Sequence, residues 1–283
     1  MREVLVKAGC CGLNVKGGAR AYYELFDVVE LQSTFYRLPR VETARRWRTE
    51  APEGFEFVVK AWQTITHLSS SPTWRKIGPI PNGWDTGRCG HLRPTPENLE
   101  AWNQTLNICR FLDSKVCVIQ SPPSFAKTGE NIGYLREFFK RIPRGNVSIA
   151  WEPRHKTWHE NPRAVKKLCT ELHLIHVVDI LKREPQSSGN ISYIRLHGLP
   201  RELNYRYSYR DEDLKLLVER VLDLETGRLR PACNRKGKSK SVDRSTRENA
   251  VVYVLFNNLT ASKDCIRFKE LLGSERRVGR VHM

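Results

Sequence analysis

Short apolar runs rich in β-branched residues alternate with longer amphipathic stretches along most of the chain. Eight runs have the length and composition of buried strands, at residues 4–9, 28–32, 55–61, 115–121, 147–152, 174–179, 192–197 and 251–257. Stretches with helical periodicity lie between most of them, at residues 19–26, 41–50, 96–112, 131–141, 162–172, 211–225 and 262–272. Strands that alternate with helices are typical of βαβ units and of a parallel sheet.

The strand–helix alternation predicts a (β/α)8 barrel of the TIM type, formed by residues 1–283 as a single domain. The length of 283 residues is close to the roughly 250 residues usual for this barrel. Residues 180–191 are too short and polar for a regular helix, so we expect one degenerate unit. A doubly wound open sheet is the alternative. Thr95 and Pro96 predict a helix start, as N-cap and first helical residue.

Two stretches interrupt the alternation. Residues 69–94 are rich in Pro, Gly and Ser and carry Trp74 and Trp84 among four Lys and Arg. Because they follow the third strand, a barrel would place them over its carboxyl-end face, where active-site loops lie. Residues 227–249 carry eight Lys and Arg against two acids and precede the last strand. A solvated loop is the ordinary interpretation of this basic insertion, and a flap that contacts phosphates is the alternative.

The charge balance favours an anionic partner. Lys and Arg total 48 against 31 Asp and Glu, which gives a net charge of +17 and a pI near 9.7. Such an excess attracts polyanions, nucleic acid first among them. The alternative is a generally basic or thermophilic proteome, in which surface Lys and Arg are abundant.

The chain carries no sign of a membrane segment. Its apolar runs are shorter than the roughly 20 residues that cross a bilayer, and Met1 leads directly into a strand-like run. We therefore expect a cytoplasmic protein without a membrane partner. No pattern indicates an oligomeric state.

Polar and ionisable residues collect where the apolar runs stop. Alternation along a strand puts Glu30 with Gln32, and Arg195 with His197, on the same face. Lys and Glu are rarely buried without partners. If these faces point inward, the carboxyl end of the barrel gathers a candidate functional site from Glu30, Lys60, Glu152, Asp179, Arg195 and His197. The alternative is a buried network in which these charges only neutralise one another.

The strand ends supply the expected site residues. We expect catalytic roles for Glu30, Lys60, Glu152, His155, Asp179 and His197. We expect substrate-binding roles for Gln32, Ser33, Tyr36, His67, Gln120, Arg154, Trp158, Arg195, Asn257 and Asn258. Packing is the alternative for Tyr36 and Trp158, and holding a loop is the alternative for His67.

Several motifs resemble the domain of unknown function 72 family, the YecE-like proteins. They lie at residues 8–12, 29–39, 55–67, 118–125, 151–158, 193–198 and 253–258, in the family's order over nearly the whole chain. The resemblance implies a TIM-type barrel, related in architecture to xylose isomerase and endonuclease IV, and no established substrate. The family's recurrent polar positions fall on every expected site residue except Asp179. The chain departs from the family pattern at Leu13, at Ser121 and in the basic insertion.

The barrel relatives suggest a metal enzyme, and Glu30, Glu152, Asp179, His155 and His197 have the side chains for a divalent ion. Lys60 and Arg195 would repel a metal in the same place, so we expect no cofactor and no metal, with a divalent ion as the alternative. Cys89 and His91 lack the second pair of ligands that a tetrahedral site needs.

A metal-free anion site fits these residues better. Lys60, Arg154 and Arg195 suit phosphate or carboxylate groups, with Glu152 or Glu30 as base and His155 or His197 as acid. Lys60 as a Schiff-base lysine stays open.

The sequence thus predicts a hydrolase or lyase that acts on a phosphate-bearing or otherwise anionic substrate, with nucleic acid as the expected class. A sugar or small-acid isomerase or aldolase is the first alternative. The second is a nucleic-acid-binding barrel without chemistry, which uses Trp74, Trp84 and residues 227–249 as its surface.

Overall fold

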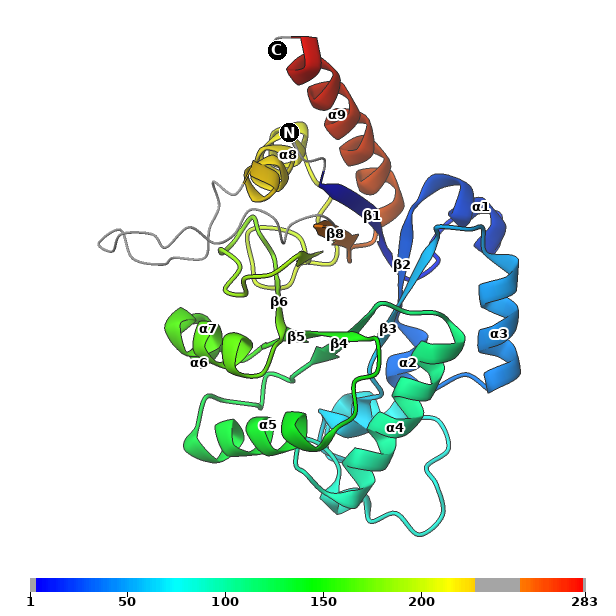
Figure 1. Ribbon diagram of the computed structural model, residues 1–283, viewed down its shortest axis with the longest axis vertical. Coiled ribbons are helices and arrows are strands. Elements are labelled where there is room, and N and C mark those ends of the chain that lie inside the picture. Colours follow the sequence, from blue (N-terminus) through cyan, green and yellow to red (C-terminus); the bar gives the residue numbers. More distant parts are fainter. Residues whose placement is uncertain (1–3, 227–249, 282–283) are drawn as a thin grey trace. The chain divides into compact units, whose positions relative to one another are not determined.

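The computed structural model describes residues 4–226 and 250–281. Its eight parallel strands follow one another in chain order and close into a barrel. Figure 1 colours the elements along the chain, from β1 in blue to α9 in red. The closed barrel confirms the predicted (β/α)8 fold and excludes the open doubly wound sheet. The basic insertion 227–249 lies outside the described residues, so its predicted role stays a prediction.

The strands are β1 (Leu5–Cys11), β2 (Val28–Leu31), β3 (Glu56–Lys60), β4 (Val116–Gln120), β5 (Ser148–Glu152), β6 (Ile175–Val178), β7 (Ile191–Leu196) and β8 (Val251–Phe256). The α-helices are α1 (Gly18–Leu25), α2 (Ser33–Tyr36), α3 (Val41–Glu50), α4 (Pro96–Phe111), α5 (Gly129–Arg141), α6 (Lys156–His159), α7 (Pro162–Glu171), α8 (Asp211–Thr226) and α9 (Ala261–Val281). Three short 3-10 helices follow β3: η1 (Gln63–Ile65), η2 (Pro72–Lys76) and η3 (Thr86–Arg88).

Each predicted strand overlaps an observed one. No helix joins β6 to β7 in the described residues, which confirms the degenerate unit. The predicted helix 262–272 was too short, since α9 continues to Val281: its apolar periodicity fades after Leu272, but the following Ser, Glu and Arg residues remain compatible with a helix. The four-residue helices α2 and α6 were not predicted, because a single turn is too short to show helical periodicity.

A separate finding concerns membranes. Among the helices of the described residues, none combines the length and the apolar character that a bilayer crossing requires.

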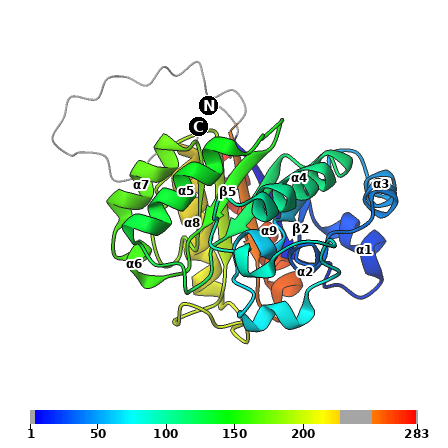
Figure 2. The same ribbon diagram turned by 90° about the horizontal axis from the view of Figure 1, so that it is seen from below.

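The chain forms two compact units, and residues 28–176 make up the first. Here β2–β5 pair in parallel, with Glu30 opposite Val58, Lys60 opposite Val118 and Gln120 opposite Glu152. These strands are buried on nearly every residue, as expected for parallel strands covered on both faces. The helices α3 and α4 lie side by side (Figure 2). The side chain of Thr95 accepts a hydrogen bond from the Asn98 amide, which confirms the predicted start of α4.

The described residues 4–27, 177–226 and 250–281 belong to the second unit. Here β1 and β7 pair in parallel with β8, while α9 packs against α8, β1 and β8. The loop after β7 is held by Asp264 at the start of α9. The Asp264 carboxylate accepts from the side chains of Asn258 and Thr260, both at 2.7 Å, and from the amide of Tyr209 at 3.3 Å.

Loss of the Asp264 carboxylate is expected to destabilise this unit. Asp264→Ala leaves the buried Tyr209 amide without its acceptor and removes one acceptor of Asn258 and an anionic partner of Arg267, which costs on the order of 2–4 kcal/mol. Urea unfolding followed by circular dichroism measures this loss.

Asp211→Ala is the matched control. Asp211 shares Arg267 with Asp264 but is exposed, so its loss costs at most about 0.5 kcal/mol. Equal destabilisation by the two variants would contradict the assigned role of Asp264.

Candidate functional site

Lys60, the last residue of β3, lies in a polar chain that begins on β2. Its side chain is almost completely buried, with Nζ 3.3 Å from Gln32 Oε1. Gln32 in turn donates its Nε2 hydrogen to Glu30 Oε1. Lys60 Nζ also lies 4.3 Å from the centroid of the Phe35 ring, within the range of a cation–π interaction. The side chain of Gln32 therefore bridges a buried carboxylate and a buried ammonium group.

A direct ion pair, between Arg154 and Glu152, lies at the end of β5. Arg154 Nη2 is 2.9 Å from Glu152 Oε1, and only 6% of the Arg154 side chain and 7% of the Glu152 side chain are exposed. A longer contact of 3.5 Å joins Arg154 Nη2 to Gln120 Oε1 at the end of β4. The register explains this grouping, because Gln120 and Glu152 lie opposite each other in neighbouring strands.

His67 lies within the electrostatic reach of both cations. Its ring centroid is 4.9 Å from that of Phe35, the ring on which Lys60 also lies. Burial, followed by the charges of Lys60, His91 and Arg154, lowers the pKa of His67 to about 3. His67 is therefore neutral near pH 7, with Thr66 Oγ1 at 2.8 Å from Nδ1. We call Glu30, Gln32, Lys60, His67, Gln120, Glu152 and Arg154 the strand-end cluster.

The long loop after β3 is fixed beside His67. The amides of Gly90, His91 and Leu92 donate to carbonyls of residues 64–66 at 2.7–2.9 Å. A Cβ atom on Gly90 would lie 2.6 Å from the backbone of His67, and Gly90 has a φ of +89°. Both observations require glycine at this position. Asn98 completes the closure with hydrogen bonds to Gly90 and Arg93.

The expected site residues that follow β2 and β5 lie on short helices. Ser33 is exposed and Tyr36 is partly exposed, at the two ends of α2. His155 is the N-cap of α6, and its Nδ1 accepts from the Thr157 amide at 3.2 Å. That bond favours the tautomer with the proton on Nε2. Trp158 is fully buried and donates to the Phe125 carbonyl at 2.7 Å, so it serves packing in this structure.

The second unit gathers a smaller group at the ends of β6–β8. Asp179 Oδ2 lies 2.8 Å from Lys182 Nζ and accepts from the His197 amide at 3.2 Å. Burial raises the pKa of Asp179, against the opposing charge of Lys182. Asn257 Nδ2 lies 3.1 Å from His197 Nδ1. Asp179 therefore joins the ends of β6 and β7.

Two further expected residues of this unit differ in their surroundings. Arg195, in β7, is among the largest fully buried side chains of the described residues. Asn258 donates to the Tyr207 carbonyl and to Asp264, both at 2.7 Å. Those bonds join Asn258 to the loop after β7. The predicted contact of Asn258 with substrate stays a prediction.

The sequence reasoning missed three residues of these groups. The Phe35 ring contacts both Lys60 and His67, and Lys182 forms an ion pair with Asp179. Gly90 allows the long loop to pack against the backbone of His67. The role of Phe35 could have been predicted from the sequence, because Phe35 lies in the polar segment that follows β2. Lys182 and Gly90 lie in irregular loops, whose partners no periodicity reveals.

The described residues were compared with the ligand sets that metal ions require. In residues 4–226 and 250–281 no three His, Cys, Asp or Glu side chains gather closely enough to hold an ion. The Cys89 thiol is buried, and burial raises its pKa to about 11, which disfavours the thiolate that binds metals. The predicted absence of a metal stays a prediction.

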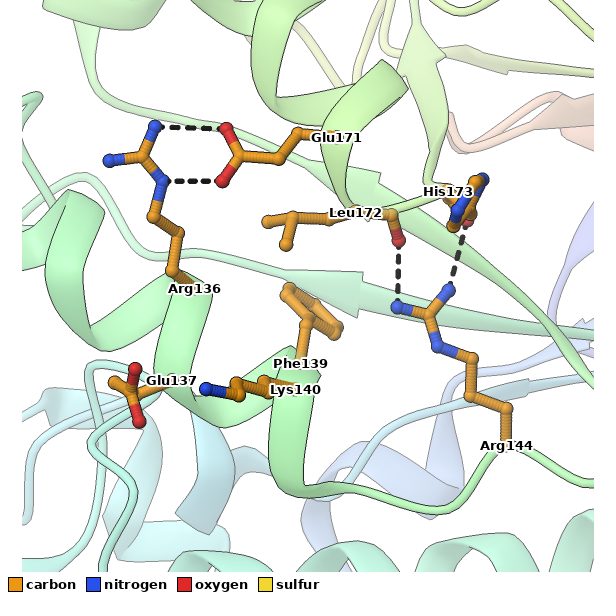
Figure 3. A pocket seen from close by; sticks show the side chains of 8 residues that line it. All are labelled: Arg136, Glu137, Phe139, Lys140, Arg144, Glu171, Leu172 and His173. Atoms are coloured by element: carbon orange, nitrogen blue, oxygen red, sulfur yellow. Dashed lines mark hydrogen bonds and ion pairs between the residues drawn. The ribbon is translucent and has the colours of Figure 1, made fainter.

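A cavity of about 430 Å³ lies elsewhere in the first unit, between the last turns of α5 and α7 (Figure 3). These turns lead into the amino ends of β5 and β6. Two of its arginines have partners: Arg136 binds Glu171 through two hydrogen bonds of 2.7 and 2.9 Å, and Arg144 donates to the carbonyls of Leu172 and His173. Because barrels of this type carry their sites at the carboxyl ends of the strands, we place the candidate site at the strand-end cluster.

The neutral state of His67 predicts a pH-dependent stability. The folded pKa near 3 lies below the ordinary value of 6.5, so the unfolded chain binds more protons between these values. Protonation therefore has no effect on stability above pH 6.5 and opposes folding increasingly as the pH falls towards 3. The slope of the unfolding free energy approaches about 1.4 kcal/mol per pH unit between the two pKa values.

Urea unfolding at several pH values, in wild type and His67→Gln, isolates this effect. The variant should lose less stability than wild type on acidification, because only the imidazole is removed. Parallel losses in the two proteins would show that the His67 pKa is not depressed.

Comparison with known proteins identifies the family. The family model described as protein of unknown function DUF72 matches residues 12–281. The UPF0759 protein YunF of Bacillus subtilis (strain 168) is 26% identical over 225 residues, which is 69% of this chain and 72% of that protein.

Solved structures show the same fold. The crystal structure of a DUF72 family protein from Enterococcus faecalis V583 has a TM-score of 0.66 and 18% identity, covering 96% of this chain and 99% of that one. A DUF72 family protein from Thermotoga maritima MSB8 gives 0.63 and 21%, covering 95% and 99%. With the family model matched over nearly its whole length, the chain belongs to the DUF72 family, as the motifs of its strand ends indicate.

Proposed function

We propose that this protein is a hydrolase or lyase for a phosphate-bearing or otherwise anionic substrate, with nucleic acid as the expected class. The observation that carries the proposal is the presence of two nearly buried cations, Lys60 and Arg154, whose charges both act on the neutral His67. Cations that are shielded from water attract an anion more strongly than exposed ones do. A buried site of this kind favours a ligand with concentrated negative charge.

The distribution of charge in the first unit supports an anionic ligand at this end. The segments that follow β2–β5 (32–40, 61–95, 121–128 and 153–161) carry Asp85 and Glu160 against nine cations: Arg37, Arg40, Arg75, Lys76, Arg88, Arg93, Lys127, Arg154 and Lys156. The segments that precede β3–β6 (51–55, 112–115, 142–147 and 172–174) are balanced, with Glu53 and Asp113 against Lys115 and Arg144. The basic excess of this unit's loops therefore lies at the carboxyl ends of its strands.

The cluster supplies the groups that such a reaction needs. Arg154 suits two-pronged contacts to phosphate oxygens, and Lys60 adds a point charge. Glu152 or Glu30 is the base that takes a proton from water in hydrolysis, or from the substrate in elimination. His155, with its proton on Nε2, donates a hydrogen bond to the leaving oxygen. Asp179 and His197 keep their proposed catalytic roles, and Arg195 and Asn257 their proposed substrate contacts.

A nucleic-acid-binding protein without chemistry is the second candidate. It is favoured by the same excess of cations on the loops after β2–β5. Turnover distinguishes the two candidates, because both bind polyanions and both weaken at high salt.

Removal of either buried cation is expected to weaken anion binding. For Lys60→Gln and Arg154→Gln, the dissociation constant of inorganic tripolyphosphate should rise about tenfold or more, since a charge-assisted contact is lost. Isothermal titration calorimetry at low salt measures this change.

Arg136→Gln is the matched control, because Arg136 is an exposed arginine at the cavity of Figure 3. The placing of the anion site would be wrong if this control lost as much affinity as the two cluster variants.

Glu152→Gln is expected to separate chemistry from binding. Turnover of phosphodiester substrates should fall about 100-fold or more, because a general base contributes that much to a rate. The affinity for tripolyphosphate should stay within about threefold, since the amide keeps an acceptor for Arg154.

Turnover is followed by product release from a panel of oligonucleotides and phosphate monoesters. No turnover of any of them by the wild-type protein would favour the binding protein without chemistry. Undiminished turnover by Glu152→Gln would remove Glu152 from the reaction.

A further inference from the structure

An aromatic surface lies next to the strand-end cluster. The rings of Trp62 and Trp84 are 5.8 Å apart between centroids, and the Trp62 indole donates to the Tyr36 carbonyl at 3.3 Å. Trp62 is buried, whereas Trp84 and Tyr36 are partly exposed. We call Tyr36, Trp62 and Trp84 the aromatic patch.

Cations border the aromatic patch. Lys76 Nζ lies 5.8 Å from the centroid of the Tyr36 ring. The carbon atoms of the exposed Arg37 side chain lie against Gly78, where a Cβ atom would meet them at 2.6–2.9 Å. Gly78 itself donates to the Tyr36 carbonyl at 2.9 Å. The loop after β3 and the helix α2 thus form one surface that combines aromatic rings with positive charge.

The patch connects to the cluster through one ring. The Phe35 centroid is 5.1 Å from that of Tyr36 in the patch, and it lies 4.3 Å from Lys60 Nζ in the cluster. A chain of contacts thus leads from Lys60 through Phe35 and Tyr36 to Trp62, whose ring lies beside that of Trp84. A nucleotide combines a phosphate with a flat ring, and a nucleic acid repeats that combination along its strand.

We infer that the aromatic patch binds a base of single-stranded nucleic acid beside the phosphate held at the strand-end cluster. This inference rests on the proposed function and names its substrate class. The base stacks on the accessible part of Trp84, while Arg37 and Lys76 contact the neighbouring phosphates. Stacking on aromatic rings accepts every base, because each has a π-face. A duplex cannot offer its bases in this way, so the single strand is the expected form.

Binding of matched oligomers tests the inference. The probes are labelled short oligo(dT) and oligo(rU), an abasic oligomer with the same number of phosphates, and unlabelled inorganic tripolyphosphate. Wild type should bind either base-bearing oligomer about tenfold more tightly than the abasic one, from the contribution of one stacked base. The dT and rU arms show whether the sugar matters.

Variants of Trp84 assign the effect to the patch. Trp84→Ala should bind base-bearing and abasic oligomers equally and keep the wild-type affinity for tripolyphosphate, whereas Trp84→Phe should retain part of the preference. Trp47→Ala is the control, a partly buried tryptophan near the end of α3 and outside the patch. It should leave all affinities unchanged, with thermal melts used to confirm that each variant is folded.

Two outcomes would overturn the inference alone: equal affinity of wild type for base-bearing and abasic oligomers, or an unchanged preference in Trp84→Ala. Binding of phosphatidylglycerol vesicles that depends on Trp84, without any preference for bases, would also overturn it in favour of a lipid surface. Failure of wild type to bind tripolyphosphate would instead count against the proposed anion site.

Discussion

The burial of Lys60 and Arg154 is the constraint around which the candidate site is built. Removing such charges from water costs several kcal/mol for each ion unless partners lie within hydrogen-bond distance. The parallel register supplies these partners at the strand ends. Gln32 and, through it, Glu30 lie beside Lys60, and Gln120 and Glu152 lie beside Arg154. The strands below are apolar and need no such partners. His67 accommodates the two positive charges by staying neutral.

The turn from β2 into α2 gives one short segment two tasks. Glu30 and Gln32 follow the two-residue period of a strand, so both side chains belong to the strand-end cluster and connect to Lys60. From Ser33 the chain turns helically, so Phe35 and Tyr36 point to different neighbours: Phe35 contacts Lys60 and His67, and Tyr36 joins the loop after β3. A change of backbone period within a few residues thus links the strand-end cluster to an aromatic surface.

Most of the fold was predictable from periodicity, and the site was predictable in part. Eight strands and their order follow from apolar runs, because buried parallel strands are apolar throughout. The polar residues after these runs, Lys60 and Glu152 among them, identify the strand ends by contrast. The partners of those residues were less accessible. Lys182 and Asp264 act across loops, and the one-turn helices that hold His155 and Tyr36 are too short to leave a periodic trace.

The loop after β3 closes on itself before the chain continues into α4. Its base is formed by residues 64–66 with 90–92, joined by backbone hydrogen bonds and secured by Asn98. Residues 69–89 are thus closed at their base by residues outside the barrel strands, and Gly78 joins them to Tyr36 of α2. A loop with a closed base behaves as an exchangeable module: evolution or design can alter its length and composition while the strand order and the buried cations stay in place. The segment can therefore change in length and sequence while the barrel around it is kept.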